Sequence, residues 1–284
     1  MLIDASLYGE SQPRLMSIAY RMLGSVTEAE DVVQEAFLRY QTTEAVQSPE
    51  GFLVRVTTRL CLDQLRKARR DTYVGPWVPE PVKTGDVDQN LALADSLTQA
   101  FLLLLERLSP DERAAFLLRT VFDYDYRQLA EILDKSEASV RQLVSRARLR
   151  LEEGALRARP TLADARRMAD HFLVACRQGD LAQLKELFAQ DVAVHSDGGG
   201  RVSAARVVLE GRDKAARFLA GVFRKWGPHC AITPTTVNGA PGLEFSAKGE
   251  TVLILSLAVQ DAIQAIYLVV NPEKLRRWSL AQIE

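Results

Sequence analysis

Cysteines are few in this sequence, and long hydrophobic runs are absent. The three cysteines, Cys61, Cys176 and Cys230, lie far apart and form no C-x-x-C pair. This spacing is typical of a reducing compartment and excludes a disulfide framework or a cysteine zinc site. The apolar runs at 101–105 and 252–259 are too short to cross a bilayer. The first ten residues lack the basic-then-apolar pattern of a signal peptide. We expect a cytoplasmic protein with no membrane partner.

The sequence also lacks an excess of charge of either sign. Lys and Arg number 36 and Asp and Glu number 37, which gives a net charge of −1. A uniformly basic protein is therefore excluded, and binding to DNA would need local patches. Two such patches exist, at residues 55–70 and 141–159. A length of 284 residues with 47% hydrophobic content fits a protein of about two domains with ample core.

Residues 126–150 (YRQLAEILDKSEASVRQLVSRARLR) carry the pattern of two short helices joined by a tight turn. In the first helix, Leu129, Ile132 and Leu133 share one face. Asp134 stands at the turn where Gly is common, and Asp tolerates the left-handed conformation better than most residues. Ser136 then offers a good N-cap for the second helix.

The second helix of this stretch is apolar on one face and polar and basic on the other. The residues expected in the core are Val140, Leu143, Val144, Ala147 and Leu151. The opposite face carries Ser139, Arg141, Gln142, Ser145 and Arg146. A helix-turn-helix places such a face in the major groove, where Arg reads guanine and Gln reads adenine. Taken alone, the stretch fits an ordinary helical hairpin with a solvated basic face equally well.

The N-terminal quarter of the chain has the patterns of three helices. The first is expected at 13–23 with Gly24 as its stop, and the second opens with a capping box at Thr27. The third starts after Ser48 with Pro49 at its first position. The residues expected to be buried are Val32, Val33, Ala36, Phe37 and Tyr40 in the second helix and Phe52, Leu53, Val56, Leu60 and Leu65 in the third.

The second and third of these helices differ in charge. The second presents Glu28, Asp31, Gln34, Glu35 and Arg39 on its outer face. The third has a positive flank made of Arg55, Arg59, Arg66, Lys67, Arg69 and Arg70. Two different partners are therefore indicated, a protein for the acidic helix and phosphate for the basic one.

In order along the chain, EDVVQEAFLRY, SPEGFLVRVTTRLCLDQLRKARR, LSPDERAAFLLR and the two-helix stretch resemble an extracytoplasmic-function sigma factor. The resemblance covers roughly residues 5–153. It implies two all-α domains, sigma region 2 at 1–70 and sigma region 4 at 91–153, joined by a linker at 71–90.

The same resemblance implies the partners. Region 2 would dock on the clamp coiled coil of RNA polymerase core and bind the −10 element, and region 4 would contact the flap and read the −35 element. The core-binding residues would be Asp31, Gln34 and Glu35. The residues that bind promoter DNA would be Arg55, Arg59, Arg66, Lys67, Ser139, Arg141, Gln142, Ser145, Arg146 and Arg148. The family usually carries Asn where Arg59 stands.

Residues 71–90 contain prolines and glycines that forbid a regular helix. Within them lies WVPEP, residues 77–81. Trp77 in this segment either caps a nearby hydrophobic surface or anchors a docking peptide.

From residue 162 to 284 the pattern indicates an α+β domain. Helices are expected at 163–176, 181–188 and 212–225. Strands of a mostly antiparallel sheet are expected at 192–195, 230–237, 242–245, 251–259 and 262–269.

This C-terminal part resembles a SnoaL-like domain of the nuclear-transport-factor-2-like superfamily, a cone whose curved sheet encloses a pocket. DGGGR, NPEKL and WVPEP resemble the marks of one sigma-factor subgroup that carries this fused domain. We expect these motifs to form a regulatory contact, and the pocket could hold a small ligand. The residues of this contact would be Trp77, Pro79, Glu80, Pro81, Asp197, Gly198, Gly199, Gly200, Arg201, Asn271, Pro272, Glu273 and Lys274.

Two other functions stay open at this stage. A helix-turn-helix repressor with a ligand-sensing domain would explain the DNA-binding pattern but not the first 70 residues. A SnoaL-like cyclase or isomerase would need an acid or base, for which the candidates are His171, His195, His229, Asp197 and Glu244. The glycine run lacks P-loop spacing, and no metal-ligand cluster stands out. We expect a sigma factor that is no enzyme, binds no cofactor or metal and is monomeric when free.

Overall fold

The computed structural model describes residues 5–67, 73–84, 96–152 and 160–278. They form two compact units. The helical unit comprises Met1–Arg69 and Leu102–Ala155, and the α+β unit comprises Arg70–Phe101 and Leu156–Glu284. The whole described part of the predicted linker, residues 73–84, therefore belongs to the α+β unit. Among the described residues, no helix combines the length and apolar character needed to span a membrane.

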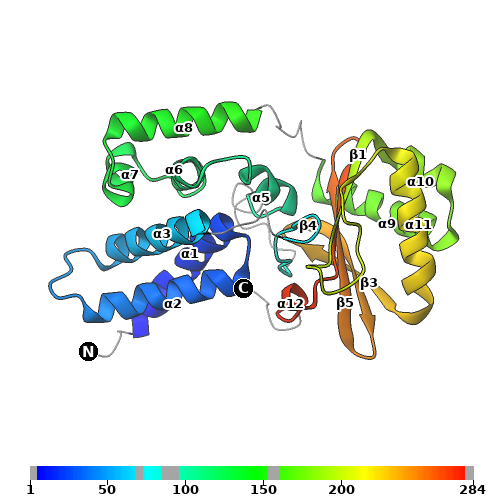
Figure 1. The fold of residues 1–284 in the computed structure, drawn as a ribbon, viewed down its shortest axis with the longest axis horizontal. Coiled ribbons are helices and arrows are strands. Elements are labelled where there is room, and N and C mark those ends of the chain that lie inside the picture. Colours follow the sequence, from blue (N-terminus) through cyan, green and yellow to red (C-terminus); the bar gives the residue numbers. More distant parts are fainter. Residues whose placement is uncertain (1–4, 68–72, 85–95, 153–159, 279–284) are drawn as a thin grey trace. The chain divides into compact units, whose positions relative to one another are not determined.

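The described residues of the helical unit include a helical bundle and a second group of shorter helices (Figure 1). Its helices are α1 (Ala5–Leu23), α2 (Val26–Thr42), α3 (Pro49–Lys67), α6 (Pro110–Thr120), α7 (Tyr126–Leu133) and α8 (Glu137–Glu152). Helices α1, α2 and α3 pack on one another, α6 packs on α8 and α1, and α3 contacts α6 and α7. Helix α5 (Gln99–Leu105) lies at the chain boundary between the two units.

The first two helices begin earlier than the sequence predicted. Helix α1 has Pro13 inside it, although proline removes a main-chain donor from a helix. The rings of Tyr8 and Phe37 are 4.7 Å apart, which holds the residues before Pro13 against α2. The cap of α2 is Ser25, whose hydroxyl accepts from the Glu28 amide, rather than Thr27.

Helix α3 starts after Ser48 as predicted, but the face that it buries differs from the predicted face. Phe52, Val56 and Leu60 are only half-buried, and so is Leu65. The buried residues are Leu53, Val54, Thr57, Thr58, Cys61 and Leu62. The Thr58 hydroxyl donates to the Val54 carbonyl at 2.8 Å, so a threonine can face the core with its polar group satisfied.

The predicted helix-turn-helix is confirmed in its elements and its core. Helix α7 ends at a left-handed Asp134 with φ 56° and ψ 51°. The Ser136 hydroxyl accepts from the Ser139 amide at 3.2 Å and caps α8. The residues predicted to be buried are all buried, namely Leu129, Ile132, Leu133, Val140, Leu143, Val144, Ala147 and Leu151.

The α+β unit has a six-stranded mixed sheet in the order β2-β1-β6-β5-β4-β3. Its elements are α9 (Leu162–Gln178), α10 (Leu181–Leu187), β1 (Phe188–Asp197), β2 (Leu209–Glu210), α11 (Arg212–Trp226), a short 3-10 turn η2 (Gly227–His229), β3 (Ala231–Val237), β4 (Ala240–Ala247), β5 (Glu250–Val259), β6 (Ile263–Val269) and α12 (Pro272–Leu275). Strands β1 and β6 are parallel, and the other neighbours are antiparallel. The predicted α+β class is confirmed, whereas β2 and α12 were not predicted.

The two faces of this sheet are covered by different parts of the unit (Figure 1). Helices α9, α10 and α11 contribute to a core cluster with alternate strand residues such as Val194, Leu255 and Leu268. In that cluster, Phe223 lies edge-on to Phe172 and Phe245, with ring centroids 6.1 and 5.2 Å apart. The intervening strand residues face the opposite side, where residues 73–84 and α12 lie.

Candidate functional site

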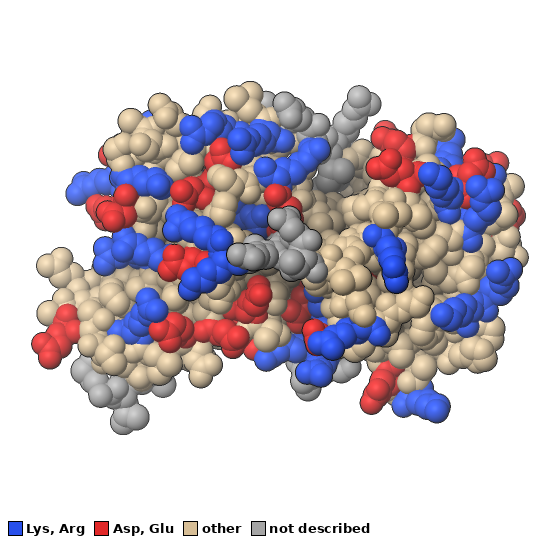
Figure 2. All heavy atoms as spheres, viewed as in Figure 1, with Lys and Arg blue, Asp and Glu red and all other residues tan. Residues whose placement is uncertain are grey.

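The exposed face of α8 is the candidate DNA reader. Ser139, Gln142 and Ser145 are exposed along it. Arg141 is held from two sides: it pairs with Glu137 at 3.3 Å, and its guanidinium lies 4.0 Å from the centroid of the Tyr126 ring. Figure 2 shows Lys and Arg side chains gathered over α8. Donors and acceptors of this kind can read base edges in the major groove.

Two other arginines of α8 have a different environment, because both bind Glu112 of α6. Arg146 Nε lies 3.2 Å from Glu112 Oε1, and Arg150 NH1 lies 2.5 Å from Oε2. The Glu112 side chain is only 4% exposed, whereas those of Arg146 and Arg150 are 52% and 49% exposed. Arg146, which was predicted to read bases, therefore also links α8 to α6 within the helical unit.

Glu112 is at the same time part of the cap of α6. Its carboxylate accepts from the Ser109 amide at 3.0 Å and from the Ser109 hydroxyl at 2.9 Å, which completes a capping box. Burial by itself raises the pKa of Glu112, but the bonds from Ser109, Arg146 and Arg150 outweigh it and leave that pKa below its usual value.

The basic flank of α3 lies against the helix-turn-helix within the helical unit. Arg66 donates to Asp111 of α6 at 2.8 Å, and Arg59 lies 3.7 Å from Asp134 in the turn between α7 and α8. Arg55 and Lys67 are exposed. Two of the four α3 cations predicted to bind DNA thus face carboxylates of the second helical group. The predicted flank residues Arg69 and Arg70 lie outside the described residues.

The outer face of α2 is acidic, as its sequence indicated. Asp31 and Gln34 are exposed, and Glu35 pairs with Arg39 at 2.8 Å. Figure 2 shows Asp and Glu side chains along α2. Leu38, which is 51% exposed, lies on the same face and was not singled out from the sequence. Its spacing from Asp31 and Gln34 is helical, so the signal was present.

The described part of the predicted linker extends the edge of the sheet. Lys83 forms an antiparallel bridge with Val237 of β3. The amide of Val82 donates to the Asn238 side chain at 2.9 Å, and the Asn238 amide donates to the Val82 carbonyl at 2.8 Å. Asn238 is fully buried and its Nδ2 also donates to the Leu97 carbonyl.

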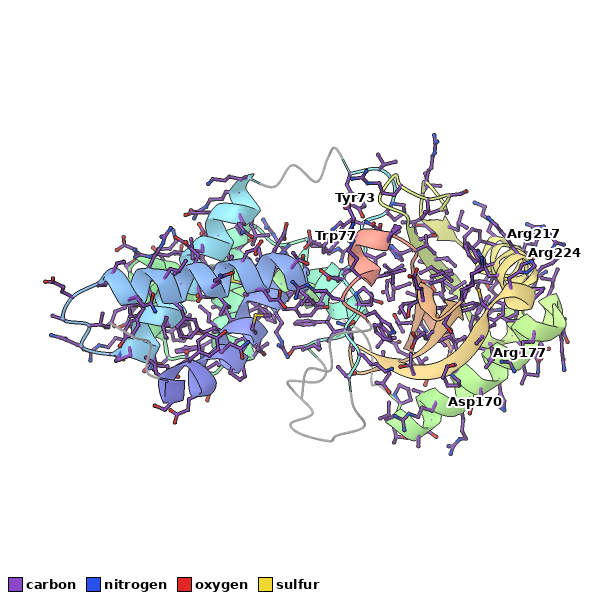
Figure 3. All side chains as sticks on the ribbon, turned by 90° about the horizontal axis from the view of Figure 1, so that it is seen from below. Tyr73, Trp77, Asp170, Arg177, Arg217 and Arg224 are labelled. Atoms are coloured by element: carbon purple, nitrogen blue, oxygen red, sulfur yellow. The ribbon has the colours of Figure 1, made fainter. Side chains whose placement is uncertain are left out.

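Asp197, at the end of β1, is the centre of the linker contact. It is fully buried and accepts from the Tyr73 hydroxyl at 2.6 Å, from the Val78 amide at 2.8 Å and from Lys274 Nζ at 2.7 Å. Lys274 also donates to the Val78 carbonyl. Burial, followed by the bond to Asp197, raises the pKa of Tyr73. Figure 3 shows Tyr73 and Trp77 beside α12.

The glycine run after Asp197 permits a close approach to the NPEKL segment. Gly199 has a φ of +58°, and a Cβ there would lie 2.3 Å from Asn271 Nδ2. Asn271 Nδ2 donates in turn to the Tyr73 hydroxyl at 3.0 Å. Arg201 pairs with Glu273 at 2.9 Å on the surface. The three motifs expected to meet are thus in contact within the α+β unit, while their regulatory role stays a prediction.

The distribution of burial among the linker residues differs from the expected one. Trp77 is half-buried, and Lys274 Nζ lies 4.5 Å from its ring centroid. The fully buried side chain beside it is Val78, followed by Pro79, Glu80, Pro81 and Val82. The Pro79 carbonyl accepts from Gln99 Nε2 at 2.9 Å. The ion pair of Asp197 and Lys274 lies at the buried centre of the contact, with the two side chains 0% and 12% exposed.

The histidines and Glu244, considered as acids or bases, lie in different surroundings. His195 faces away from the apolar core cluster and lies beside Tyr267, with ring centroids 5.2 Å apart. Burial lowers the pKa of His195. His171 and His229 are exposed, and Glu244 accepts from the Thr251 hydroxyl.

Residues 7–71 match the family model for sigma-70 region 2, and residues 98–151 match that for sigma-70 region 4. The chain is 36% identical to ECF RNA polymerase sigma factor SigJ of Mycobacterium tuberculosis, with 96% of this chain and 93% of SigJ aligned. The chain belongs to the extracytoplasmic-function RNA polymerase sigma factors. A second relative is the probable ECF sigma factor SigI of the same species, 31% identical over 92% of this chain and 91% of SigI.

The likeness to sigma factors extends to the C-terminal domain. The crystal structure of Mycobacterium tuberculosis SigJ matches with a TM-score of 0.77 and 33% identity, over 95% of this chain and 98% of that chain. The predicted family, with its fused C-terminal domain, is confirmed. As a sigma factor, the protein directs promoter recognition and transcription initiation by RNA polymerase. The region 2 match argues against the repressor alternative, which has no use for that region.

Proposed function

We propose that the contact centred on Asp197 controls how this sigma factor initiates transcription. The observation that carries this proposal is the set of bonds from Tyr73, Val78 and Lys274 to one buried carboxylate. The first two donors belong to the chain between regions 2 and 4, and Lys274 belongs to NPEKL. Holding the middle of that connection restricts the separations that regions 2 and 4 can reach, and the two regions must bind two promoter elements at once.

The helical unit supplies a reason why such control matters. In it, Arg66 and Arg59 of region 2 face Asp111 and Asp134 of region 4. These arginines reach the −10 element only after the two regions separate. We propose that release of the linker contact favours this separation, and that a coupling of about 1–3 kcal/mol changes activity roughly 5- to 150-fold.

In vitro transcription with RNA polymerase core tests this control. Trp77→Ala, which removes the ring over Lys274, and Gly199→Ala, which forces the turn away from Asn271, should change activity in the same direction. The double variant should add little, because both changes break one contact. Lys248→Ala, at an exposed hairpin of the same unit, is the control. Independent and additive effects would show that the contact has no regulatory role.

Promoter reading is assigned to the free face of α8. Arg141, Gln142 and Ser145 lie on that face, and replacing a base-reading arginine costs about 1–3 kcal/mol at one or two base pairs. Arg148, exposed on the same helix, is assigned to phosphate. A transcription series across −35 variants checks the assignment: Arg141→Ala should relax preference at particular positions. An equal loss of transcription at all −35 sequences would show that Arg141 does not read these base pairs.

We assign binding of RNA polymerase core to the acidic face of α2, which would dock on the clamp coiled coil of the polymerase. Region 4 would contact the flap of the polymerase. Leu38 supplies an exposed apolar group beside Asp31 and Gln34. Charge reversal at Asp31 and Glu35 should weaken binding to core without changing helical content. Leu38→Ala should weaken it as well, because an exposed leucine gains burial only with a partner. Unchanged affinity for core would contradict the assignment.

We further propose that the C-terminal domain regulates rather than catalyses, and that the protein acts in the cytoplasm as a free monomer until it binds core. Among the described residues, His195 and Asp197 face the side of the sheet opposite to the apolar core cluster and helices α9–α11. A small ligand for this domain stays part of the proposal. Turnover of a small molecule that is lost in His195→Gln and needs no core would contradict the regulatory role.

A further inference from the structure

The cations of α8 fall into two groups. Arg141 and Arg148 are exposed, and Arg141 contacts Glu137 and the ring of Tyr126. Arg146 and Arg150, one turn apart, both bind the carboxylate of Glu112. The spacing of four residues places this pair on one stripe of the helix, turned toward α6.

Both oxygens of the Glu112 carboxylate accept hydrogen bonds. It accepts from the amide and the hydroxyl of Ser109, from Arg146 Nε and from Arg150 NH1. Because Arg146 uses Nε, the plane of its guanidinium is set by this bond. The carboxylate is buried, so competition from water at these bonds is weak.

Helix α6 is itself fixed within the helical unit. Its Arg113 is buried and donates to the Met22 carbonyl of α1 at 2.7 Å. The Ala114 and Leu117 side chains are fully buried. The bonds of Arg146 and Arg150 to Glu112 of this helix restrict the rotation of α8 about its axis. They also restrict its sliding along that axis. Rotation decides which side chains reach base edges.

We propose that Glu112 is a positioning residue for promoter specificity, which holds α8 in its reading orientation through Arg146 and Arg150 and keeps both cations from unselective binding to phosphate. The inference deepens the proposed reading of the −35 element by α8 and rests on it.

The variant that separates this role from mere stability is Glu112→Gln. Gln at this position of a capping box still accepts from and donates to the cap residue, so α6 keeps its start. The charge that holds the two arginines is lost. Freed arginines raise binding to phosphate and steepen its salt dependence, with a slope change of roughly 1–2 for one or two added contacts. At the same time, selection among −35 sequences should fall about tenfold, the scale of one good base contact.

The experiment uses holoenzyme made from RNA polymerase core and the full chain. Promoters are first selected from a library randomised at the −35 element with the unaltered protein. Transcription and competitive binding are then measured on selected and scrambled sequences over a range of salt. Glu131→Gln on α7 gives the same charge change at an exposed site, where its side chain is 69% exposed. Ser109→Ala weakens the cap but leaves the carboxylate.

The expected result is a signature found only in Glu112→Gln: weaker binding to selected sequences together with stronger binding to scrambled ones. An equal loss on both, or the same result from Ser109→Ala, would reduce Glu112 to a structural residue and overturn the inference. An unchanged preference and salt slope would also overturn it. If the unaltered protein selects no −35 sequence at all, the proposed reading by α8 fails instead.

Discussion

Glu112 of the helical unit and Asp197 of the α+β unit are both buried carboxylates that bind cations, yet they join very different parts of the chain. Glu112 binds arginines 34 and 38 residues away, within region 4. Asp197 binds groups 77 to 124 residues away in the chain, on both sides of region 4. The cations also differ: those of Glu112 are about half exposed, whereas the Lys274 side chain is 12% exposed.

Glu112 therefore joins neighbouring helices of one region, whereas Asp197 joins segments that lie far apart in the chain. Arg146 and Arg150 can be hydrated when Glu112 is lost, so the helix-turn-helix core keeps its packing. Lys274 cannot reach water so easily, and a buried charge without its partner is costly. We therefore expect loss of Asp197 to affect the stability of its unit most, and loss of Glu112 to affect mainly the proposed reading of the promoter by α8.

The largest effect is expected from Asp197→Asn. This change leaves Lys274 buried beside a neutral amide and weakens the bonds from Tyr73 and Val78. Breaking one partner of a buried ion pair typically costs about 3–5 kcal/mol. Denaturant unfolding of the full chain should show the loss in the transition of the α+β unit, and residues 73–84 should become sensitive to protease.

The control for this prediction is the surface pair of the same motifs. Glu273→Gln removes the negative charge from the pair with Arg201, in which both side chains are more than half exposed. An exposed pair of this kind contributes about 0–1 kcal/mol. A similar loss from both variants would mean that burial does not distinguish the two ion pairs.

A smaller loss, about 1.5–3 kcal/mol at most, is expected from Glu112→Gln in the helical unit, because two hydrogen bonds to charged groups are weakened while the arginines regain water. The pKa of Glu112 lies below its usual value of 4.5 in the folded state. Its contribution is therefore present above that value and is lost as the pH falls through the folded-state pKa. Acid unfolding curves should show a weaker pH dependence in the variant than in the unaltered chain.

Tyr73→Phe should cost about 1 kcal/mol, the net value of a typical hydrogen bond. The hydroxyl bonds Asp197 and Asn271, but Asp197 keeps its other donors. The ring over Lys274 also stays. Thermal unfolding checks the size of the effect. A loss as large as that of Asp197→Asn would make Tyr73, rather than the buried ion pair, the main link to the linker.

The smallest effect concerns pH and His195. Burial lowers its folded-state pKa below the ordinary 6.5, so the folded state favours the neutral ring. Stability is fully present above the unfolded pKa and is lost as the pH falls from there through the folded-state pKa. The α+β unit should therefore weaken on acidification below about pH 6.5, and His195→Gln should remove that part of the pH dependence.

Much of the helical unit could be predicted because its signals are local. The spacing of Leu129, Ile132 and Val140, the left-handed Asp134 and the cap at Ser136 all act within a few residues, and each is confirmed. The errors arose where tertiary contacts outweighed local rules. Packing of Tyr8 on Phe37 lets α1 begin several residues before Pro13. In α3, the Thr58 hydroxyl bonds to the Val54 carbonyl, so Thr58 can be buried where larger apolar residues were expected.

The sequence by itself determined the family, most of the helices and strands, the helix-turn-helix core and the motifs that would meet. These follow from side-chain periodicity, caps and turn residues, which depend on neighbours along the chain. Only the tertiary structure decided that Glu112 holds two arginines of α8 and that Asp197 is the buried centre of the linker contact. No local pattern encodes these partners, because charge pairing and burial depend on which distant segments the fold brings together.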